Sequence, residues 1–222
     1  MHSFAHHHKG TEFSPAPRTQ GIVLNWPSWF YDLTARFGLR IMMGVSRQAL
    51  LQRVVALAEL QPGESVLDVG CGTGSLAIVA KERVGAAGRV CGIDPSVSLL
   101  AGARRKAARR NLAIDFQRGV IERLPFADQS FDAVLSTIMM HHLPDDIKRQ
   151  GLAEIARVLK PGGRLLIADF KRPEPREGQP VKFGAGMLGI QDLPALMKDA
   201  GFLLVETGET RFKGIGFALG KR

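Results

Sequence analysis

Short apolar runs alternate with longer amphipathic stretches along most of the chain. The short runs are rich in β-branched residues and are typical of buried strands, whereas apolar residues at helical spacing predict the stretches between them as helices. Five strands are predicted in this way, at Ser65–Val69, Arg89–Ile93, Ile114–Gln117, Ala133–Ser136 and Arg164–Ala168. The predicted helices are Val45–Glu59, Leu76–Val84, Val97–Arg110 and Ile147–Leu159. Such alternation favours a mainly parallel sheet with helices on both faces.

The pattern changes after Asp169. Lys171–Gly189 is rich in Pro, Gly and charged residues and is expected to be a mobile connection. A helix at Leu193–Ala200 and two antiparallel strands at one sheet edge, Leu203–Thr207 and Gly214–Leu219, are predicted to follow. The fold class is therefore α/β, with a doubly wound, seven-stranded, mostly parallel sheet and an antiparallel C-terminal edge strand. Pro161-Gly162-Gly163 is expected to be a turn between the last long helix and its strand.

The length of 222 residues suits one α/β domain. We expect that domain to span residues 18–222, with an aromatic-rich N-terminal lid at about residues 22–44. Residues 1–17 carry several histidines and resemble expression-vector sequence, so we exclude them from the fold. No apolar run approaches the roughly 20 residues that a membrane-spanning helix requires.

The net charge of +9 and the pI near 10.1 raise the question of an anionic partner. The densest basic cluster comprises Arg104, Arg105, Lys106, Arg109 and Arg110, and we interpret it as a solvated helix face. An aromatic-interleaved basic groove and an Asn-Pro-Pro-Tyr-like base-flipping sequence are both lacking, so nucleic acid is not the favoured partner. The two cysteines form neither a disulfide framework nor a zinc spacing, so we expect no metal site and a cytoplasmic location.

The segment VLDVGCGTG, residues 66–74, places an acid and three alternating glycines at the end of a buried strand. The glycines permit positive φ and close approach of a ligand, and the helix expected from about Ser75 offers unpaired N–H groups to an anion. Asp94 ends the next strand, where a carboxylate can accept hydrogen bonds from a ribose diol. A tight structural turn would explain the glycines alone equally well. NAD would also fit such a loop, but its fingerprint requires Gly or Ala where the chain has Ser75.

With its later motifs, the chain resembles the seven-strand, Rossmann-like S-adenosylmethionine-dependent methyltransferases, in particular the ubiquinone and menaquinone biosynthesis C-methyltransferases. The resemblance covers roughly residues 60–170 and rests on several motifs at family spacing. These are VLDVGCGTG (66–74), GIDPS (92–96), LPFADQSFDAVLS (124–136), HHLPD (141–145) and LKPGGRLLIADF (159–170), with AGF (200–202) in the tail.

The resemblance implies S-adenosyl-L-methionine as the cofactor and assigns its binding residues. These are Tyr31, Asp68, Gly70, Cys71, Gly72, Gly74, Asp94, Pro95, Ser96, Val120, Ile121, Ser136 and Thr137. The glycines and Tyr31 would surround the methionyl part, and Asp94 would bind the ribose hydroxyls. The family commonly places an aspartate in a Gly-Asp-Ala-Glu sequence against the adenine amine, where this chain has Gly119-Val120-Ile121-Glu122. We therefore expect the adenine to be held by backbone groups near Val120 and Ile121, or to be held less tightly.

His141, His142 and Asp169 are candidates for a catalytic base, because they follow strands at the edge where the family places its substrate pocket. The alternative is packing or shaping of the cofactor site for His141 and His142, and helix capping or a salt bridge for Asp169. Met139, Met140, Met187 and Leu188 are candidates for an apolar acceptor cavity, with core packing as the alternative. Trp29 and Phe30 are expected in the lid or in the core.

The sequence thus predicts an enzyme that transfers a methyl group from S-adenosylmethionine to O, C or N of a small apolar or aromatic metabolite, with a quinone-like or phenolic acceptor favoured. A nucleic-acid-modifying methyltransferase and a non-catalytic S-adenosylmethionine-binding protein are the alternatives. Metal-assisted catechol methylation is disfavoured because its carboxylate set is not evident, and arsenite methylation because two cysteines cannot supply a thiolate triad. The expected partner is a small-molecule methyl acceptor. Peripheral membrane contact stays open, and so does the choice between monomer and homodimer.

Overall fold

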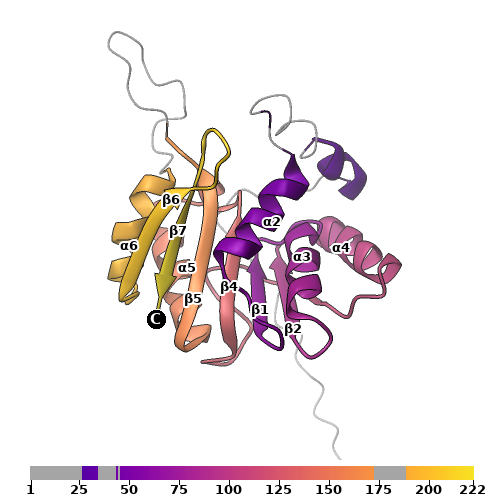
Figure 1. The fold of residues 1–222 in the computed structure, drawn as a ribbon, viewed down its shortest axis with the longest axis horizontal. Helices are drawn as coiled ribbons and strands as arrows, with labels where there is room; N and C mark the ends of the chain where they lie inside the picture. Colours follow the sequence, from indigo (N-terminus) through magenta and orange to yellow (C-terminus); the bar gives the residue numbers. More distant parts are fainter. Residues whose placement is uncertain (1–26, 35–43, 45, 173–188) are drawn as a thin grey trace, which may run out of the picture.

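The computed structural model describes residues 27–34, 44, 46–172 and 189–222. Their strands form one sheet in the order β3-β2-β1-β4-β5-β7-β6 (Figure 1). The strands are β1 (Ser65–Val69), β2 (Arg89–Asp94), β3 (Asp115–Arg118), β4 (Phe131–Thr137), β5 (Leu159–Phe170), β6 (Leu204–Glu209) and β7 (Ile215–Lys221). Strands β1 to β5 pair in parallel, which confirms the predicted seven-stranded, mostly parallel sheet.

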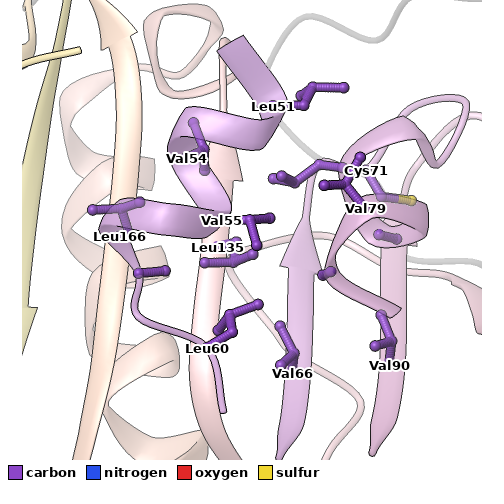
Figure 2. Packing of buried hydrophobic residues seen from close by; sticks show 14 of the residues in the cluster. Leu51, Val54, Val55, Leu60, Val66, Cys71, Val79, Val90, Leu135 and Leu166 are labelled. Carbon is purple, nitrogen blue, oxygen red and sulfur yellow. The ribbon is translucent and has the colours of Figure 1, made fainter. Parts of the chain in front are cut away.

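Helices cover both faces of this sheet, as the alternating pattern predicts. They are α2 (Arg47–Leu57), α3 (Ser75–Val84), α4 (Val97–Arg109), α5 (Asp145–Val158) and α6 (Leu193–Asp199), with short 3-10 helices η1 (Met140–His142) and η2 (Ile190–Asp192). One core cluster packs α2, α3 and α4 against one face, and Figure 2 shows part of it, with Val54 and Val55 of α2 above Leu135 of β4. A second cluster packs α5 and α6 against the other face. Successive strand residues such as Val66 and Leu67 divide between the two clusters because strand side chains alternate in direction.

The C-terminal strands are antiparallel, as predicted, and β7 lies inside the sheet. It pairs antiparallel with β5 over residues 164–170 and with β6 over residues 204–209. The outermost position on this side therefore belongs to β6, which precedes β7 in the sequence. This arrangement protects the long strand β5 on both sides.

The prediction of a turn at Pro161-Gly162-Gly163 is wrong, because these residues lie within β5. Helix α5 ends at Val158 and the strand begins at the next residue. The register with β4 jumps from Leu159 to Arg164, so the segment forms a bulge. The Arg222 backbone holds it, accepting from the Gly162 N–H at 3.0 Å and donating to the Gly163 carbonyl at 2.9 Å.

The sheet reverses its winding direction between β1 and β4, which are adjacent in space but separated in sequence by β2 and β3. Parallel sheets bind ligands beyond the carboxyl ends of the strands at such a switch point. The loops after β1, β2, β3 and β4 all meet there. No described helix is long and apolar enough to cross a membrane.

Candidate cofactor and active site

A pocket opens at the carboxyl ends of β1 to β4, at the switch point of the sheet. It is lined by Tyr31, Val69, Gly70, Ile93, Asp94, Pro95, Leu99, Gly119, Val120, Ile121, Glu122, Ile138, Met139, His142 and Leu143. Seven of the predicted site residues are in that set: Tyr31, Gly70, Asp94, Pro95, Val120, Ile121 and His142. A smaller hollow adjoins it, sharing Tyr31, Gly70 and Ile138. Asp68, Cys71 and Thr137 line this second hollow together with Arg47.

Asp94 joins the glycine loop to the start of α4. Its Oδ2 accepts from the Gly72 N–H at 2.9 Å, and its Oδ1 accepts from the Ser96 N–H at 2.8 Å. Burial raises the pKa of Asp94, while these two backbone hydrogen bonds lower it. Each carboxylate oxygen has two lone pairs, so both can also accept from hydroxyl groups of a ligand. Ser96 itself is buried and caps α4, accepting from the Leu99 N–H at 3.4 Å.

Asp68 lies beneath the glycine loop and secures the start of α3. Helix α3 begins after Gly74, which has no side chain to cap it, and the Asp68 Oδ2 accepts from the Ala77 N–H at 3.0 Å instead. Asp68 is 2% exposed. Burial raises its pKa to about 7, against the opposing effect of the Ala77 hydrogen bond. Its carboxyl group therefore supports the loop in addition to lining the smaller hollow.

Gly72 and Gly74 of the loop lie close to different neighbours. A Cβ on Gly72, whose φ is +52°, would lie 3.3 Å from the Tyr31 hydroxyl oxygen, so the loop and Tyr31 approach each other closely. Gly74 differs, because its Cβ would lie 2.6 Å from the Phe116 ring and 2.9 Å from the Ala103 Cβ. Gly74 therefore serves helix and strand packing, and it lines neither hollow.

Tyr31 reaches the site from a helical segment at residues 28–34, which Figure 1 shows in indigo beyond the strand ends. Asp32 fixes this segment, since its carboxylate lies 2.7 Å from the Lys106 Nζ and 2.9 Å from an Arg47 Nη. The Thr73 hydroxyl of the glycine loop donates to the same carboxylate at 2.6 Å. No local sequence pattern marks Asp32, because its partners come from distant parts of the chain.

The basic cluster on α4 is not simply a solvated face, which corrects the interpretation from the sequence. Lys106 is partly buried and donates to Asp32, to Thr73 at 2.8 Å and to Ser75 at 3.2 Å. Arg105 donates to the Ser28 hydroxyl at 2.9 Å. Two members of the cluster thus hold the N-terminal segment against α4.

His141 and His142 occupy η1, directly after β4, and differ in their surroundings. The His141 Nδ1 lies 2.8 Å from the Asp169 Oδ1, and the His141 backbone N–H donates to the Asp169 Oδ2 at 3.2 Å. His142 lines the pocket, whereas His141 and Asp169 do not. Burial lowers the pKa of His142, as does the neighbouring His141, while Asp169 opposes them. The two imidazole rings lie 3.9 Å apart between centroids.

The candidates for the acceptor cavity and the lid lie in different surroundings. Met139 lines the pocket, but Met140 is 1% exposed in the second core cluster, so its candidacy for the acceptor cavity is wrong. Met187 and Leu188 lie outside the described residues, as do the leader at 1–17 and most of the predicted lid and connection. Trp29 is 68% exposed and Phe30 39% exposed, which rules out core packing for both.

Some buried polar atoms near the carboxyl ends of β3 and β4 lack a hydrogen-bond partner; Glu122 lines the pocket, Thr137 lines the smaller hollow and Ser136 lines neither. Within the described ranges, the Oγ of Ser136, the Oγ1 of Thr137 and both carboxylate oxygens of Glu122 are shielded from solvent and accept or donate no hydrogen bond. Such groups are rare in folded proteins and usually indicate a ligand or function. The two thiols offer no nucleophile, because burial raises the pKa of Cys91 to about 11 and that of Cys71 well above its ordinary value.

Comparisons with known proteins agree with this geometry. Residues 66–163 match the family described as "Methyltransferase domain". Demethylmenaquinone methyltransferase from Deinococcus radiodurans is 40% identical over 143 residues, covering 64% of this chain and 56% of that protein. Residues 66–163 thus carry a methyltransferase domain, similar to those of the ubiquinone and menaquinone biosynthesis methyltransferases. The cofactor of this family is S-adenosylmethionine, so the NAD alternative is discarded.

The chain is also similar to other methyltransferases. An arsenite methyltransferase from Halobacterium salinarum is 34% identical over 159 residues, covering 68% of this chain and 40% of that protein. A crystal structure of a SAM-dependent methyltransferase from Aquifex aeolicus shares the fold, with a TM-score of 0.67 and 23% identity over 88% of this chain and 98% of that one. The chain spans about half the length of the curated relatives it matches, from 40% to 59%.

Proposed function

We propose that this chain transfers a methyl group from S-adenosylmethionine to a small apolar or aromatic acceptor. The observation that carries the proposal is Asp94, whose two oxygens bridge the glycine loop and α4 at the edge of the pocket. A carboxylate at the end of the second strand, next to a glycine loop, is suited to a ribose diol. The pocket is also lined by Glu122, whose two carboxylate oxygens are buried without a hydrogen-bond partner.

The residues present fit the cofactor at each of its parts. Asp94 would accept from the ribose hydroxyls, and Tyr31 and Gly70, which line both hollows, would flank the methionyl chain. Arg47 lines the smaller hollow with Thr137 and would pair with the methionyl carboxylate. Ser136 and Thr137 end β4 with unpaired hydroxyl groups. When bound, S-adenosylmethionine supplies a methyl group on a positively charged sulfonium.

The chemistry requires alignment more than an elaborate catalytic apparatus. Holding donor and acceptor in line can supply about 7–11 kcal/mol of the barrier. His142 faces the pocket and its lowered pKa keeps the imidazole neutral at neutral pH, so it can accept the proton that the acceptor loses. His141 and Asp169 act as positioning residues, because their mutual hydrogen bonds hold η1 in place.

An apolar acceptor is supported by the side of the pocket that His142 occupies. Ile138, Met139 and Leu143 line the same pocket as His142. The Deinococcus relative is named for its action on demethylmenaquinone, a quinone. We therefore favour a quinone-like or phenolic acceptor. Arsenite is less suited, since both thiols of this chain are buried and protonated at neutral pH.

We also propose that the surface formed by Trp29, Phe30 and Leu33 contacts an anionic lipid bilayer. These side chains are 68%, 39% and 45% exposed on one short helical segment. Arg105 attaches to that segment at Ser28, and Arg109 is exposed on the same helix as Arg105. Apolar rings beside arginines suit a headgroup region. This surface lies next to the pocket through Tyr31, so it would bring a lipid-soluble acceptor close to the site.

Fewer observations bear on the alternative functions, the location, the domain bounds and the oligomeric state. A nucleic-acid-modifying activity finds little support, since Lys106 and Arg105 serve the N-terminal segment. A non-catalytic cofactor-binding protein differs from an enzyme only in turnover. The cytoplasmic location, the single domain over residues 18–222 and the choice between monomer and homodimer stay predictions.

Calorimetry with S-adenosylmethionine and a turnover assay with a quinol or phenol panel test the proposal. The wild-type chain should bind the cofactor, and Asp94→Asn should weaken binding by roughly 10- to 100-fold, because a charge-assisted hydrogen bond is worth about 1.5–3 kcal/mol. Asp199→Asn, which changes an exposed carboxylate on α6, is the matched control. Equal affinities for the wild type and Asp94→Asn would contradict the assignment. Tight binding without turnover would favour the non-catalytic alternative.

A further inference from the structure

A hollow outside the candidate active site lies between α2, α3 and α4, the helices that cover one face of the sheet (Figure 1). We call it the basic hollow, and it is lined by Gln48, Ser75, Ile78, Val79, Lys106, Arg109 and Arg110. None of these residues lines the pocket or the smaller hollow. Its volume of about 170 Å³ is well above the roughly 10–15 Å³ that one water needs, so it can admit a small ligand.

The three cations of the basic hollow lie on one face at the end of α4. Lys106, Arg109 and Arg110 have the spacing i, i+3 and i+4, which makes them neighbours on a helix surface. Burial lowers the pKa of Lys106, and the charges of Arg47 and Arg110 lower it further, although Asp32 opposes them. The C-terminal end of a helix favours cations, but its dipole is equivalent to only about half a negative charge. The helix end alone therefore does not balance these three side chains.

The carboxylates that pair with these cations leave an excess of positive charge. Asp32 lies 2.7 Å from the Lys106 Nζ, but it is shared with a second cation on α2. The Glu82 Oε1 lies 2.8 Å from an Arg110 Nη. Arg109 is exposed, and no carboxylate of the described residues pairs with it. Its guanidinium group is therefore available to an anion in the hollow.

The uncharged polar groups of the basic hollow can also donate to a ligand. The Ser75 Oγ accepts from the Lys106 Nζ at 3.2 Å, and no described group takes the hydrogen of this hydroxyl. The side-chain amide of Gln48 has no partner in the part of the chain that the structure describes. Ile78 and Val79, which are 4% and 8% exposed, add an apolar wall. Donors from three helices thus line one hollow.

We propose that the basic hollow binds the phosphate group of a phosphate monoester, with the Arg109 guanidinium as its main contact. This site goes beyond methyl transfer and does not depend on it. A phosphate monoester carries about −1.5 to −2 charge at neutral pH and presents three acceptor oxygens, whereas a carboxylate carries one charge and has two oxygens. The guanidinium group can donate two parallel hydrogen bonds to phosphate oxygens. The excess charge and the additional donors of Ser75 and Gln48 therefore favour phosphate.

Two sources share this chemistry, a soluble phosphate ester and the phosphatidate headgroup of a bilayer. Lys106 connects the basic hollow to the segment that carries Trp29, because it pairs with Asp32 of that segment. The hollow therefore adjoins the surface of Trp29, Phe30 and Leu33 that we propose to contact a bilayer. The test includes one measurement for each source.

Calorimetry with glycerol 3-phosphate tests the soluble source. Binding should saturate, and glycerate, which has a carboxylate in place of the phosphate, should bind at least tenfold more weakly. Arg109→Gln should weaken the binding of glycerol 3-phosphate by roughly 10- to 100-fold, because it removes a charge-assisted hydrogen-bond donor. Arg211→Gln is the matched control, since it removes the same charge from an exposed arginine between β6 and β7 and should leave the affinity unchanged.

Vesicle sedimentation tests the lipid source. It compares vesicles that contain phosphatidate with vesicles that contain phosphatidylglycerol, a diester, at matched surface potential. A preference for phosphatidate that Arg109→Gln abolishes and Arg211→Gln retains would support the site and identify the ligand as a lipid. Saturable binding of glycerol 3-phosphate without that preference would support the site and identify a soluble ester. The proposal is overturned if neither measurement detects the monoester, or if Arg109→Gln and Arg211→Gln lose binding equally.

Discussion

The Asp169 Oδ1 lies 2.8 Å from the His141 Nδ1, so the buried carboxylate that ends β5 engages the histidine that does not face the pocket. The sequence analysis treated both residues as possible bases. Their pairing leaves His142 as the imidazole that can meet an acceptor. Asp169 still influences His142 through its charge, which raises the pKa of that imidazole against the effects of burial and of His141.

His142→Asn should reduce turnover by about 10²-fold or more while cofactor affinity is retained, because it removes the proton acceptor. In the wild type, the midpoint of the rise of kcat with pH should lie below the ordinary pKa of an imidazole, since burial lowers the pKa of His142. Asp169→Asn should move that rise to still lower pH, because losing a nearby negative charge destabilises the imidazolium. A pH profile that is the same in the wild type and Asp169→Asn would contradict this coupling.

Gly74→Ala should destabilise the protein more than Gly201→Ala. Both glycines have positive φ, +72° and +92°, but only Gly74 has close neighbours, at 2.6 Å and 2.9 Å, and Gly201 has none within 4 Å. The Gly201 variant should lose about 1 kcal/mol to backbone strain. The Gly74 variant should lose a further ~1–3 kcal/mol by overpacking against Phe116 and Ala103. Urea unfolding measures the difference, and equal losses would show that the packing adapts.

Asp68 should contribute to the free energy of unfolding at low pH. This contribution should decrease as pH rises from about 4 to about 7. Its folded pKa is raised to about 7 from 3.8, so the folded state holds a proton that the unfolded state has lost. The full effect is on the order of 4 kcal/mol. Asp68→Asn keeps an oxygen for the Ala77 N–H and should flatten stability over this window. Urea midpoints measured at several pH values give the comparison.

Asp132 provides a control, because folding lowers its pKa whereas folding raises the pKa of Asp68. Hydrogen bonds from Lys160 and Ser65 lower its pKa against burial, so its contribution is present above the unfolded pKa and lost as pH falls through the folded one. Asp132→Asn should change the acid side of the stability curve and leave the window between pH 4 and 7 unaltered. A wild-type curve that matches Asp68→Asn throughout would contradict the prediction for Asp68.

Vesicle sedimentation tests the surface of Trp29, Phe30 and Leu33. The protein should bind anionic vesicles more strongly than zwitterionic ones, and Trp29→Ala with Leu33→Ala should weaken binding about tenfold or more. Leu203→Ala with Leu204→Ala removes apolar side chains that are 80% and 61% exposed at the start of β6, and it should have no effect. In a chain with Trp26→Phe, Trp29 is the sole tryptophan, so its emission should shift to the blue on binding. Equal binding by both pairs of variants would contradict the proposed surface.

The sequence predicted what depends on local pattern. Strands β1, β2 and β4 are buried on both faces and read as continuous apolar runs, so their positions were clear. The glycine loop and Asp94 follow directly from their places after β1 and β2. The resemblance to the methyltransferases supplied the cofactor, which neither periodicity nor charge identifies.

What the sequence could not provide depends on pairing between distant segments. Asp32 has partners 15, 41 and 74 residues away, and nothing near it in the sequence marks them. The bulge in β5 was mistaken for a turn because Pro-Gly-Gly has the same composition in either setting. The burial of the Glu122 carboxylate depends on how the segment after β3 packs against α5, which no motif encodes.

The inserted position of β7 has a consequence for how the chain reaches this structure. Strands β1 to β5 can pair as soon as residues 65–170 have been synthesised, but β5 then has an open edge that only residues 215–221 fill. An open edge of this length can recruit strands from other molecules. A chain that stops before Ile215 should therefore aggregate during synthesis even though every residue proposed to hold the cofactor is already present.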